Sequence, residues 1–142
     1  MSKHYASAAW KGNLAGGNGE FKLKTSGYKG SYSFTSRFED DKSSSSPEEL
    51  IGAAHAGCFS MAFAHVLDQS GFKPEEISTE AEVTLERGSD GFSITGILLK
   101  TKGKVGGIGK EKFLEIANEA KENCPVSKAL KATAIRLEAE LI

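Results

Sequence analysis

The sequence predicts an α+β fold in which one antiparallel sheet packs on a long, buried central helix. Segments that alternate apolar and polar residues are typical of strands with one wet face, and they occur on both sides of an uncharged helical segment. The expected order is three strands, a helix, two strands, two helices and a last strand. This order lacks the regular strand–helix alternation of a doubly wound fold.

Three strands are expected before the central helix. The first covers Tyr5–Lys11, and the second contains Phe21–Leu23. The third is expected over Tyr32–Phe38, where the aromatic residues would share one face and Arg37 would lie on the other. A polar loop, Asp40–Ser46, then leads into the helix.

The central helix is expected from Pro47 to about Ser70. Ser46 suits the capping position, Pro47 the first helical position and Glu49 the third residue after the cap. Gly71 suits the left-handed conformation in which many helices end. Residues 50–67 carry no formal charge and approach the length of a membrane span. Because they include two histidines, a serine and two glycines, we expect a helix buried by protein on nearly every side.

The remaining elements follow the same patterns. Two strands are expected over Ile77–Glu86 and Phe92–Thr101, because apolar and polar residues alternate there. An amphipathic helix is expected over Lys110–Asn123, and a shorter one begins at Pro125. The last strand is expected over Ile135–Leu141. We expect residues 1–142 to form a single domain, because this length suits one core.

Composition excludes several functional classes. Eighteen Lys and Arg against nineteen Asp and Glu give a net charge of −1, so we expect neither nucleic acid nor membrane as a partner. The only two cysteines, Cys58 and Cys124, are too few for a disulfide scaffold, and no zinc-type cluster accompanies them. We therefore expect no metal. The polar amino terminus is unlike a signal peptide, so a cytoplasmic location is expected.

A homodimer is expected from the central helix. One sheet of six short strands can cover only one side of a helix that is buried all round. Gly52, Ala53, Ala56 and Gly57 are small enough to let a second helix approach closely, and two-fold dimers are the commonest closed oligomers. The alternative is a monomer whose second helix and loops cover the same surface.

The two cysteines are either inert core residues or a reactive pair. Buried free cysteines commonly behave as small apolar side chains. However, Cys124 precedes Pro125 and is the expected N-cap of the next helix, where backbone N–H groups favour a thiolate. Cys58 lies in the middle of its helix, so it needs a nearby cation to react at neutral pH.

Three kinds of charged or basic residue could assist Cys58. Arg37 is the candidate cation, because the other two arginines are expected to be solvated, although it could be an ordinary strand residue. Glu48 and Glu49 stabilise the helix dipole in the first turn, and one of them could also orient Arg37. His55 lies one turn before Cys58 and could be its base or one ligand of a metal, although a third ligand is missing.

Two segments are highly specific to one family. The chain contains PEELIGAAHAGCFSM, with RFE before it, and CPVS further on. These segments resemble the osmotically inducible OsmC family and the related organic hydroperoxide resistance proteins, over nearly the whole chain and most closely the OsmC branch. The resemblance implies an OsmC-like fold in an intertwined homodimer. It also implies a thiol-dependent peroxidase that acts in oxidative and osmotic stress defence.

The resemblance also implies residue roles. The peroxidatic thiol of the family maps onto Cys58, and the resolving thiol maps onto Cys124. The arginine and glutamate that organise the site map onto Arg37 and Glu48, with Glu49 as the adjacent alternative. A sulfenic acid on Cys58 would be resolved as an intramolecular disulfide. No cofactor is implied, because an external dithiol, such as a lipoylated or thioredoxin-like protein, would restore both thiols.

Helix geometry limits how these residues can meet. Glu48 and Cys58 are ten positions apart, which is about 15 Å along a continuous helix. One arginine cannot contact both side chains in the same chain. We therefore expect Arg37 or Glu48, or both, to reach Cys58 from the partner subunit.

Substrate preference and function class rest on weaker patterns. Apolar neighbours of Cys58, such as Phe59, Met61 and Phe63, favour organic hydroperoxides over hydrogen peroxide. Two other classes stay open: a thiol redox sensor that oxidises once without turnover, and a small-ligand-binding stress protein whose cysteines are structural.

Overall fold

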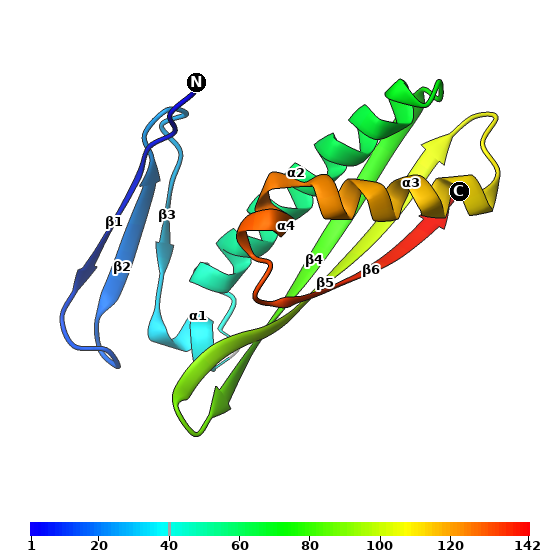
Figure 1. The fold of residues 1–142 in the computed structure, drawn as a ribbon. Coiled ribbons are helices and arrows are strands. Elements are labelled where there is room, and N and C mark those ends of the chain that lie inside the picture. Colours follow the sequence, from blue (N-terminus) through cyan, green and yellow to red (C-terminus); the bar gives the residue numbers. More distant parts are fainter. Residues whose placement is uncertain (40) are drawn as a thin grey trace. The chain divides into compact units, whose positions relative to one another are not determined.

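The computed structural model describes residues 1–39 and 41–142, so Asp40, the first residue of the expected polar loop, lies outside the described residues. The chain divides into two compact units, Met1–Leu50 and Ile51–Ile142. The single domain over residues 1–142 stays a prediction. Helices and separate sheets in both halves of the chain confirm the α+β class and its central helix (Figure 1).

The first unit contains an antiparallel sheet of three strands (Figure 1). In chain order these are β1 (Ala6–Lys11), β2 (Asn18–Leu23) and β3 (Lys29–Tyr32). Two aromatic rings lie over glycines on the neighbouring strand: Phe21 faces Gly30, and Tyr32 faces Gly19. A Cβ atom at either glycine would collide with the ring, so both positions need glycine.

The strand expected over Tyr32–Phe38 is wrong after its first residue, because the chain turns there into a short helix, α1 (Phe34–Phe38). Ser33 begins the helix with a capping box, in which Ser33 and Ser36 each donate a backbone N–H to the other's hydroxyl at 3.0 Å. The phenylalanines that bound α1 are four residues apart, so they share a face in a helix as they would in a strand. Arg37 therefore lies in the last turn of α1 and not at a strand end.

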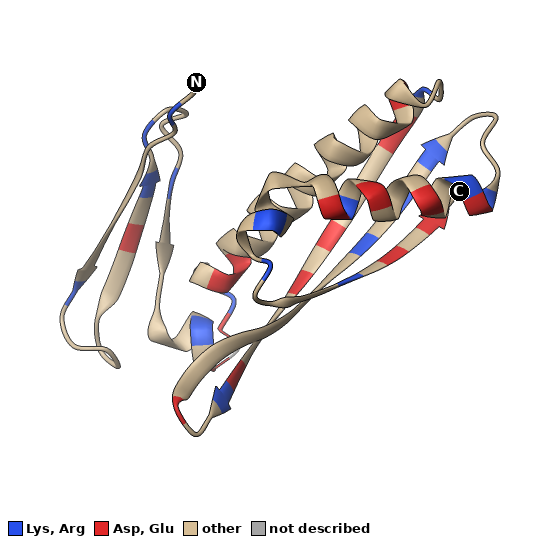
Figure 2. Cartoon of the chain, in the orientation of Figure 1, with Lys and Arg blue, Asp and Glu red and all other residues tan. Residues whose placement is uncertain are grey.

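The predicted central helix is confirmed as α2 (Pro47–Gln69). The hydroxyl of Ser46 accepts the backbone N–H of Glu49 at 3.1 Å, as expected of a cap. Gly71, with a φ of 86°, adopts the left-handed conformation after the helix. Figure 2 shows charged residues only near the two ends of α2.

The second unit contains the other sheet and two more helices (Figure 1). These elements are β4 (Pro74–Gly88), β5 (Gly91–Val105), α3 (Lys110–Asn123), α4 (Pro125–Ala129) and β6 (Ala134–Leu141). β4 pairs antiparallel with β5, whereas β6 pairs parallel with β5. The expected single antiparallel sheet of six strands is therefore wrong, because the described residues form two sheets of three strands each. The last pairing is parallel because α3 and α4 carry the chain back to the start of β5.

The core of the second unit lies between α2, α3 and the sheet. Phe59, Phe63 and Leu67 from α2 are completely buried, as are Leu99 from β5 and Phe113 from α3. The rings of Phe63 and Phe113 meet edge to face, with their centroids 5.0 Å apart. This packing fixes the central part of α2 against α3.

Only one face of α2 is buried within a single chain. Gly52 packs on β4, where an added Cβ would lie 3.4 Å from the carbonyl oxygen of Ala81. Ala53, Gly57 and Met61 lie on the exposed face, and Met61 is 77% exposed. The expected burial on nearly every side is thus wrong for the isolated chain. By length and composition α2 could cross a membrane, but its inner face belongs to the protein core described above.

Phe63→Ala should lower the free energy of unfolding by about 3–5 kcal/mol, because it would leave a cavity between α2 and α3. Urea unfolding followed by circular dichroism measures this loss. Leu14→Ala is the control, because Leu14 is exposed and its truncation should change the free energy by less than about 0.5 kcal/mol. Equal losses in the two variants would contradict the assigned core.

Candidate active site

The two cysteines lie beside each other in the second unit. The Sγ atoms of Cys58, on α2, and Cys124, between α3 and α4, are 3.1 Å apart, and both thiols are free. Cys124 is completely buried, whereas Cys58 is partly exposed. A disulfide has an S–S length of about 2.05 Å, so a closure of about 1 Å would join them.

The junction of α3 and α4 positions Cys124. Its backbone N–H donates to the carbonyl oxygen of Ala120 at 2.9 Å, which ends α3. Cys124 is also the N-cap of α4, with Pro125 in the first turn, so the N-cap predicted from the sequence is confirmed.

The surroundings of the two thiols shift their pKa values in opposite directions. Burial alone would raise the pKa of Cys124, but hydrogen bonds from the backbone of Ser127, the thiol of Cys58 and the Ser127 hydroxyl hold it below the ordinary cysteine value. Burial raises the pKa of Cys58, and the adjacent Cys124 raises it further, although the N–H of Val126 opposes them.

A second polar cluster lies in the first unit and joins α1 to the first turn of α2. The Nε and Nη2 atoms of Arg37 donate to Oε1 of Glu48 at 3.0 and 2.7 Å. Glu48 is buried, and its other oxygen, Oε2, has no hydrogen-bond partner among the described residues. The guanidinium of Arg37 is partly exposed and also lies 5.2 Å from the ring centre of Phe38. The ion pair thus holds the guanidinium of Arg37 in place, and it leaves Oε2 of Glu48 available to accept a further hydrogen bond.

The serine-rich segment before α2 holds α1 in place. The hydroxyl of Ser36 donates to the carbonyl oxygen of Ser45 at 2.6 Å, and the hydroxyls of Ser33 and Ser44 are 3.0 Å apart. These bonds fix the helix that carries Arg37. The segment is therefore part of the support for the ion pair as well as a connection.

Glu48, and not Glu49, contacts the arginine. Glu49 is exposed, and its Oε2 accepts a hydrogen bond from the hydroxyl of Ser45 at 2.6 Å. Both acids lie in the first turn of α2, but only Glu48 points toward α1.

His55 contacts a residue that sequence reasoning did not consider. Its Nε2 lies 2.8 Å from the hydroxyl of Ser127, on α4, and both residues are buried. The described residues contain no group of three His, Cys, Asp or Glu side chains that could hold a metal ion. The only signal for Ser127 in the sequence is its position three residues after Cys124, in the first turn of a helix capped by that cysteine.

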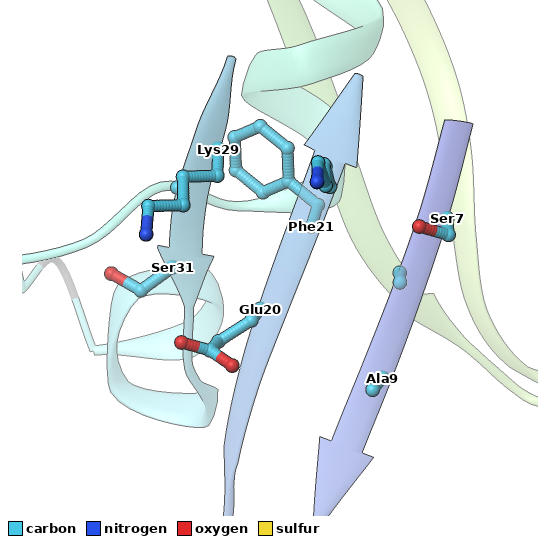
Figure 3. A pocket seen from close by; sticks show the side chains of 9 residues that line it. Ser7, Ala9, Glu20, Phe21, Lys29 and Ser31 are labelled. Carbon is cyan, nitrogen blue, oxygen red and sulfur yellow. The ribbon is translucent and has the colours of Figure 1, made fainter. Parts of the chain in front are cut away.

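The sheet of the first unit carries a hollow of its own. Figure 3 shows Phe21 and Lys29 at this hollow, with Glu20 and Ser31 beside them. Its nine lining residues include no cysteine and no histidine. The thiol pair is therefore the better candidate for chemistry.

Comparison with known proteins identifies the family. Residues 39–140 match the family model described as OsmC-like protein. The chain is 44% identical to Peroxiredoxin OsmC of Escherichia coli (strain K12) over 126 residues, which are 88% of this chain and 87% of that protein. This chain belongs to the OsmC-like protein family.

One further relative and two solved structures are similar to this OsmC-like chain. The organic hydroperoxide resistance protein OhrB of Bacillus subtilis (strain 168) is 30% identical over 70% of this chain and 73% of its own length. The crystal structure of OhrB superposes with a TM-score of 0.74, covering 97% of this chain and 98% of that one, at 25% identity. An OsmC-like protein of Vibrio cholerae shares the fold with a TM-score of 0.78, at 20% identity, covering 98% of this chain and 99% of that chain.

In the Cys58→Ser variant of this OsmC-like protein, the Cys124 thiolate should form at lower pH than in an unstructured chain, because donated hydrogen bonds lower its pKa. Thiolate absorbance at 240 nm, followed against pH, measures the midpoint. The same variant unfolded in urea is the matched control, because unfolding exposes Cys124 to water. A folded midpoint at or above the unfolded one would show that these donors do not stabilise the thiolate.

Proposed function

We propose that this protein is a cysteine-based peroxidase that reduces organic hydroperoxides, with Cys58 as the peroxidatic thiol and Cys124 as the resolving thiol. The observation that carries this proposal is the 3.1 Å contact between the two free thiols. The names of the relatives agree with it, since one is a peroxiredoxin and another an organic hydroperoxide resistance protein. The protein is thus an antioxidant oxidoreductase of the stress response.

The reaction follows from the two sulfur atoms. The Cys58 thiolate attacks one peroxide oxygen, the O–O bond breaks, and the other oxygen leaves with a proton as an alcohol or, with hydrogen peroxide, water. Cys124 then attacks the Cys58 sulfenic acid, and a disulfide and one water form. An external dithiol reduces this disulfide and becomes a disulfide itself, so no bound cofactor enters the cycle. A lipoylated or thioredoxin-like protein could supply the dithiol.

Cys58 needs a cation that its own surroundings do not supply, because burial and Cys124 raise its pKa. Arg37 is the cation we assign to it, held by Glu48. Since α2 is one unbroken helix, the ten positions from Glu48 to Cys58 correspond to about 15 Å. We therefore infer that Arg37 acts on the Cys58 of a partner subunit.

A homodimer would provide that arrangement. The exposed face of α2 carries the small or apolar residues Ala53, Ala54, Gly57 and Met61. An added Cβ at Gly57 would meet no atom within 4 Å in the single chain, so a second helix has room to approach there. We also place the protein in the cytoplasm, where reducing thiols are available.

The preference for organic hydroperoxides rests on fewer residues than the sequence suggested. Phe59 and Phe63 are completely buried in the core, so they cannot line a substrate path. Met61 is exposed on the face that we assign to the dimer. Comparing the rates of peroxide reduction with cumene hydroperoxide and with hydrogen peroxide tests this preference. Equal rates would contradict it.

One equivalent of cumene hydroperoxide should convert the reduced protein into a form with a Cys58–Cys124 disulfide, because the two sulfurs are already in contact. Peptide mass spectrometry identifies the linkage. Cys124→Ser should instead keep a sulfenic acid on Cys58. Absence of both products would contradict the mechanism, and peroxide consumption that stops after one turnover with a dithiol present would favour a redox sensor.

Gly57→Glu should convert the dimer into monomers, because it would place a charge on the face where the two α2 helices meet. Sedimentation velocity at micromolar concentration measures the mass, and circular dichroism checks that the chain stays folded. Ala132→Glu, at an exposed position on the turn before β6, is the control and should remain dimeric. A Gly57→Glu protein that stays dimeric would place the interface elsewhere.

A further inference from the structure

His55 is a buried polar residue that the mechanism above does not use. Its side chain is completely buried on α2, and burial lowers the pKa of His55, so the ring is neutral at physiological pH. Nε2 lies 2.8 Å from the hydroxyl of Ser127, on α4, whereas Nδ1 is buried without a hydrogen-bond partner among residues 1–39 and 41–142. The bond to Ser127 is therefore the polar contact that compensates the burial of this ring.

The helix that carries Ser127 is short and mostly exposed. α4 spans five residues, which are too few to form a stable helix alone. Within α4, whose residues are all described, Ser127 is the only buried one. Val126 and Leu130, the residue after the helix, pack on the core but are only partly buried. The bond between His55 and Ser127 thus gives α4 a buried, directional contact with α2.

This bond and the thiol contact join the same two segments at matching positions. His55 precedes Cys58 by three residues, so the two side chains share a face of α2. Ser127 follows Cys124 by three residues in the first turn of α4, where the N–H of Lys128 donates to the carbonyl oxygen of Cys124 at 3.0 Å. The 2.8 Å bond therefore lies one helical turn from the 3.1 Å contact on both sides.

We propose that the hydrogen bond between His55 and Ser127 positions the resolving thiol, because it holds the start of α4 against α2 and so keeps Cys124 beside Cys58. Both are positioning residues, since they act through the helical turns that carry the two cysteines. The bond restricts α4 before a disulfide forms, so that less conformational freedom is lost when the sulfurs join. This inference rests on the peroxidase function proposed above, in which Cys124 resolves the oxidised Cys58.

The positioning acts on the step that forms the disulfide. Cys124 loses its thiol proton, and its thiolate attacks the sulfur of the Cys58 sulfenic acid. The S–S bond forms as the S–O bond breaks, and the departing hydroxide takes up one proton, so the products are one disulfide and one water. The Cys124 sulfur is oxidised and the Cys58 sulfur is reduced. The attack of Cys58 on the peroxide does not involve α4, so that earlier step should not depend on the bond.

The equilibrium between dithiol and disulfide measures the positioning without any peroxide. The protein is equilibrated in redox buffers of dithiothreitol or glutathione, quenched with acid and alkylated with N-ethylmaleimide in denaturant. Intact mass spectrometry then gives the fraction that carries the Cys58–Cys124 disulfide. Ser127→Ala should lower the equilibrium constant for disulfide formation about fivefold, the effect of one hydrogen bond on the population in which the sulfurs are in contact.

A pair of variants tests His55 even if Ser127→Ala does not fold. His55→Gln keeps an N–H donor that can reach Ser127, whereas His55→Leu removes it and preserves apolar packing. The equilibrium constant should fall about fivefold in His55→Leu and be largely restored in His55→Gln. The double variant His55→Leu/Ser127→Ala should fall no further than either single variant, because the two residues act through one bond.

Ser60→Ala is the matched control for Ser127→Ala. Ser60 also lies on α2, two residues after Cys58, but its hydroxyl donates to that of Thr79, on β4, at 2.8 Å. The same substitution therefore removes a hydrogen bond between α2 and the sheet and leaves the bond to α4 intact. Its equilibrium constant should equal that of the unmodified protein. Circular dichroism checks that every variant is folded.

Reaction with peroxide tests the bond in its proposed role. Reduced protein is mixed with one equivalent of cumene hydroperoxide and quenched with acid at successive times, and intact mass spectrometry follows the sulfenic acid and the disulfide. In Ser127→Ala the disulfide should form about fivefold more slowly. Formation of the sulfenic acid on Cys58 should keep its rate, so this intermediate should accumulate.

Three results would overturn the positioning role: unchanged equilibrium constants in Ser127→Ala and His55→Leu, an equal fall in Ser60→Ala, or an equal fall in His55→Gln and His55→Leu. Failure of the proposed function is distinguishable from these. In that case the unmodified protein would not react with peroxide, while the equilibrium between dithiol and disulfide would still report whether the bond holds Cys124 beside Cys58.

Discussion

The contact between Cys58 and Cys124 is the interaction on which the proposed chemistry depends. It joins two segments that are far apart in the sequence, the middle of α2 and the junction of α3 and α4. Phe63 of α2 and Phe113 of α3 also pack edge to face. Apolar packing of α2 against α3 thus accompanies the sulfur contact, and about 1 Å of further approach would form the bond.

The surroundings of this contact shift the pKa values of the two cysteines in opposite directions. The pKa of Cys124 is lowered by hydrogen bonding, whereas burial raises the pKa of Cys58. A peroxidatic Cys58 would require a cation at the time of attack, and the cation that we propose is Arg37, which is held by Glu48. If that cation arrives from a partner, dimer formation and thiol activation are the same event. An isolated chain would then keep Cys58 protonated and unreactive.

The sequence predicts much of the fold where local patterns suffice. The bounds of α3 follow from its amphipathic pattern and from Pro125 beyond its end, and the same proline marks Cys124 as an N-cap. α1 is missed because two phenylalanines four positions apart share a face in either a helix or a strand. The parallel pairing of β6 is missed because alternation does not encode the direction of a neighbouring strand.

The site is predictable in part for similar reasons. Both cysteines, Arg37 and the two candidate glutamates stand out by type and position, but adjacent acids in a first turn look alike in sequence. Only the side-chain directions separate Glu48 from Glu49. The bond from His55 to Ser127 joins residues 72 positions apart, so no local pattern indicates it. Only tertiary packing brings His55 and Ser127 together.

Whether Arg37 acts across a dimer is tested most directly by mixing two inactive variants. Arg37→Met keeps Cys58 but lacks the cation, and Cys58→Ser keeps the cation but lacks the peroxidatic thiol. Refolding equal amounts together gives mixed dimers in which one site combines an intact Cys58 with the partner's Arg37. Random pairing of two-fold dimers should then restore about a quarter of the normal peroxidase activity. A mixture as inactive as its parent variants would show that the arginine serves the cysteine of its own chain.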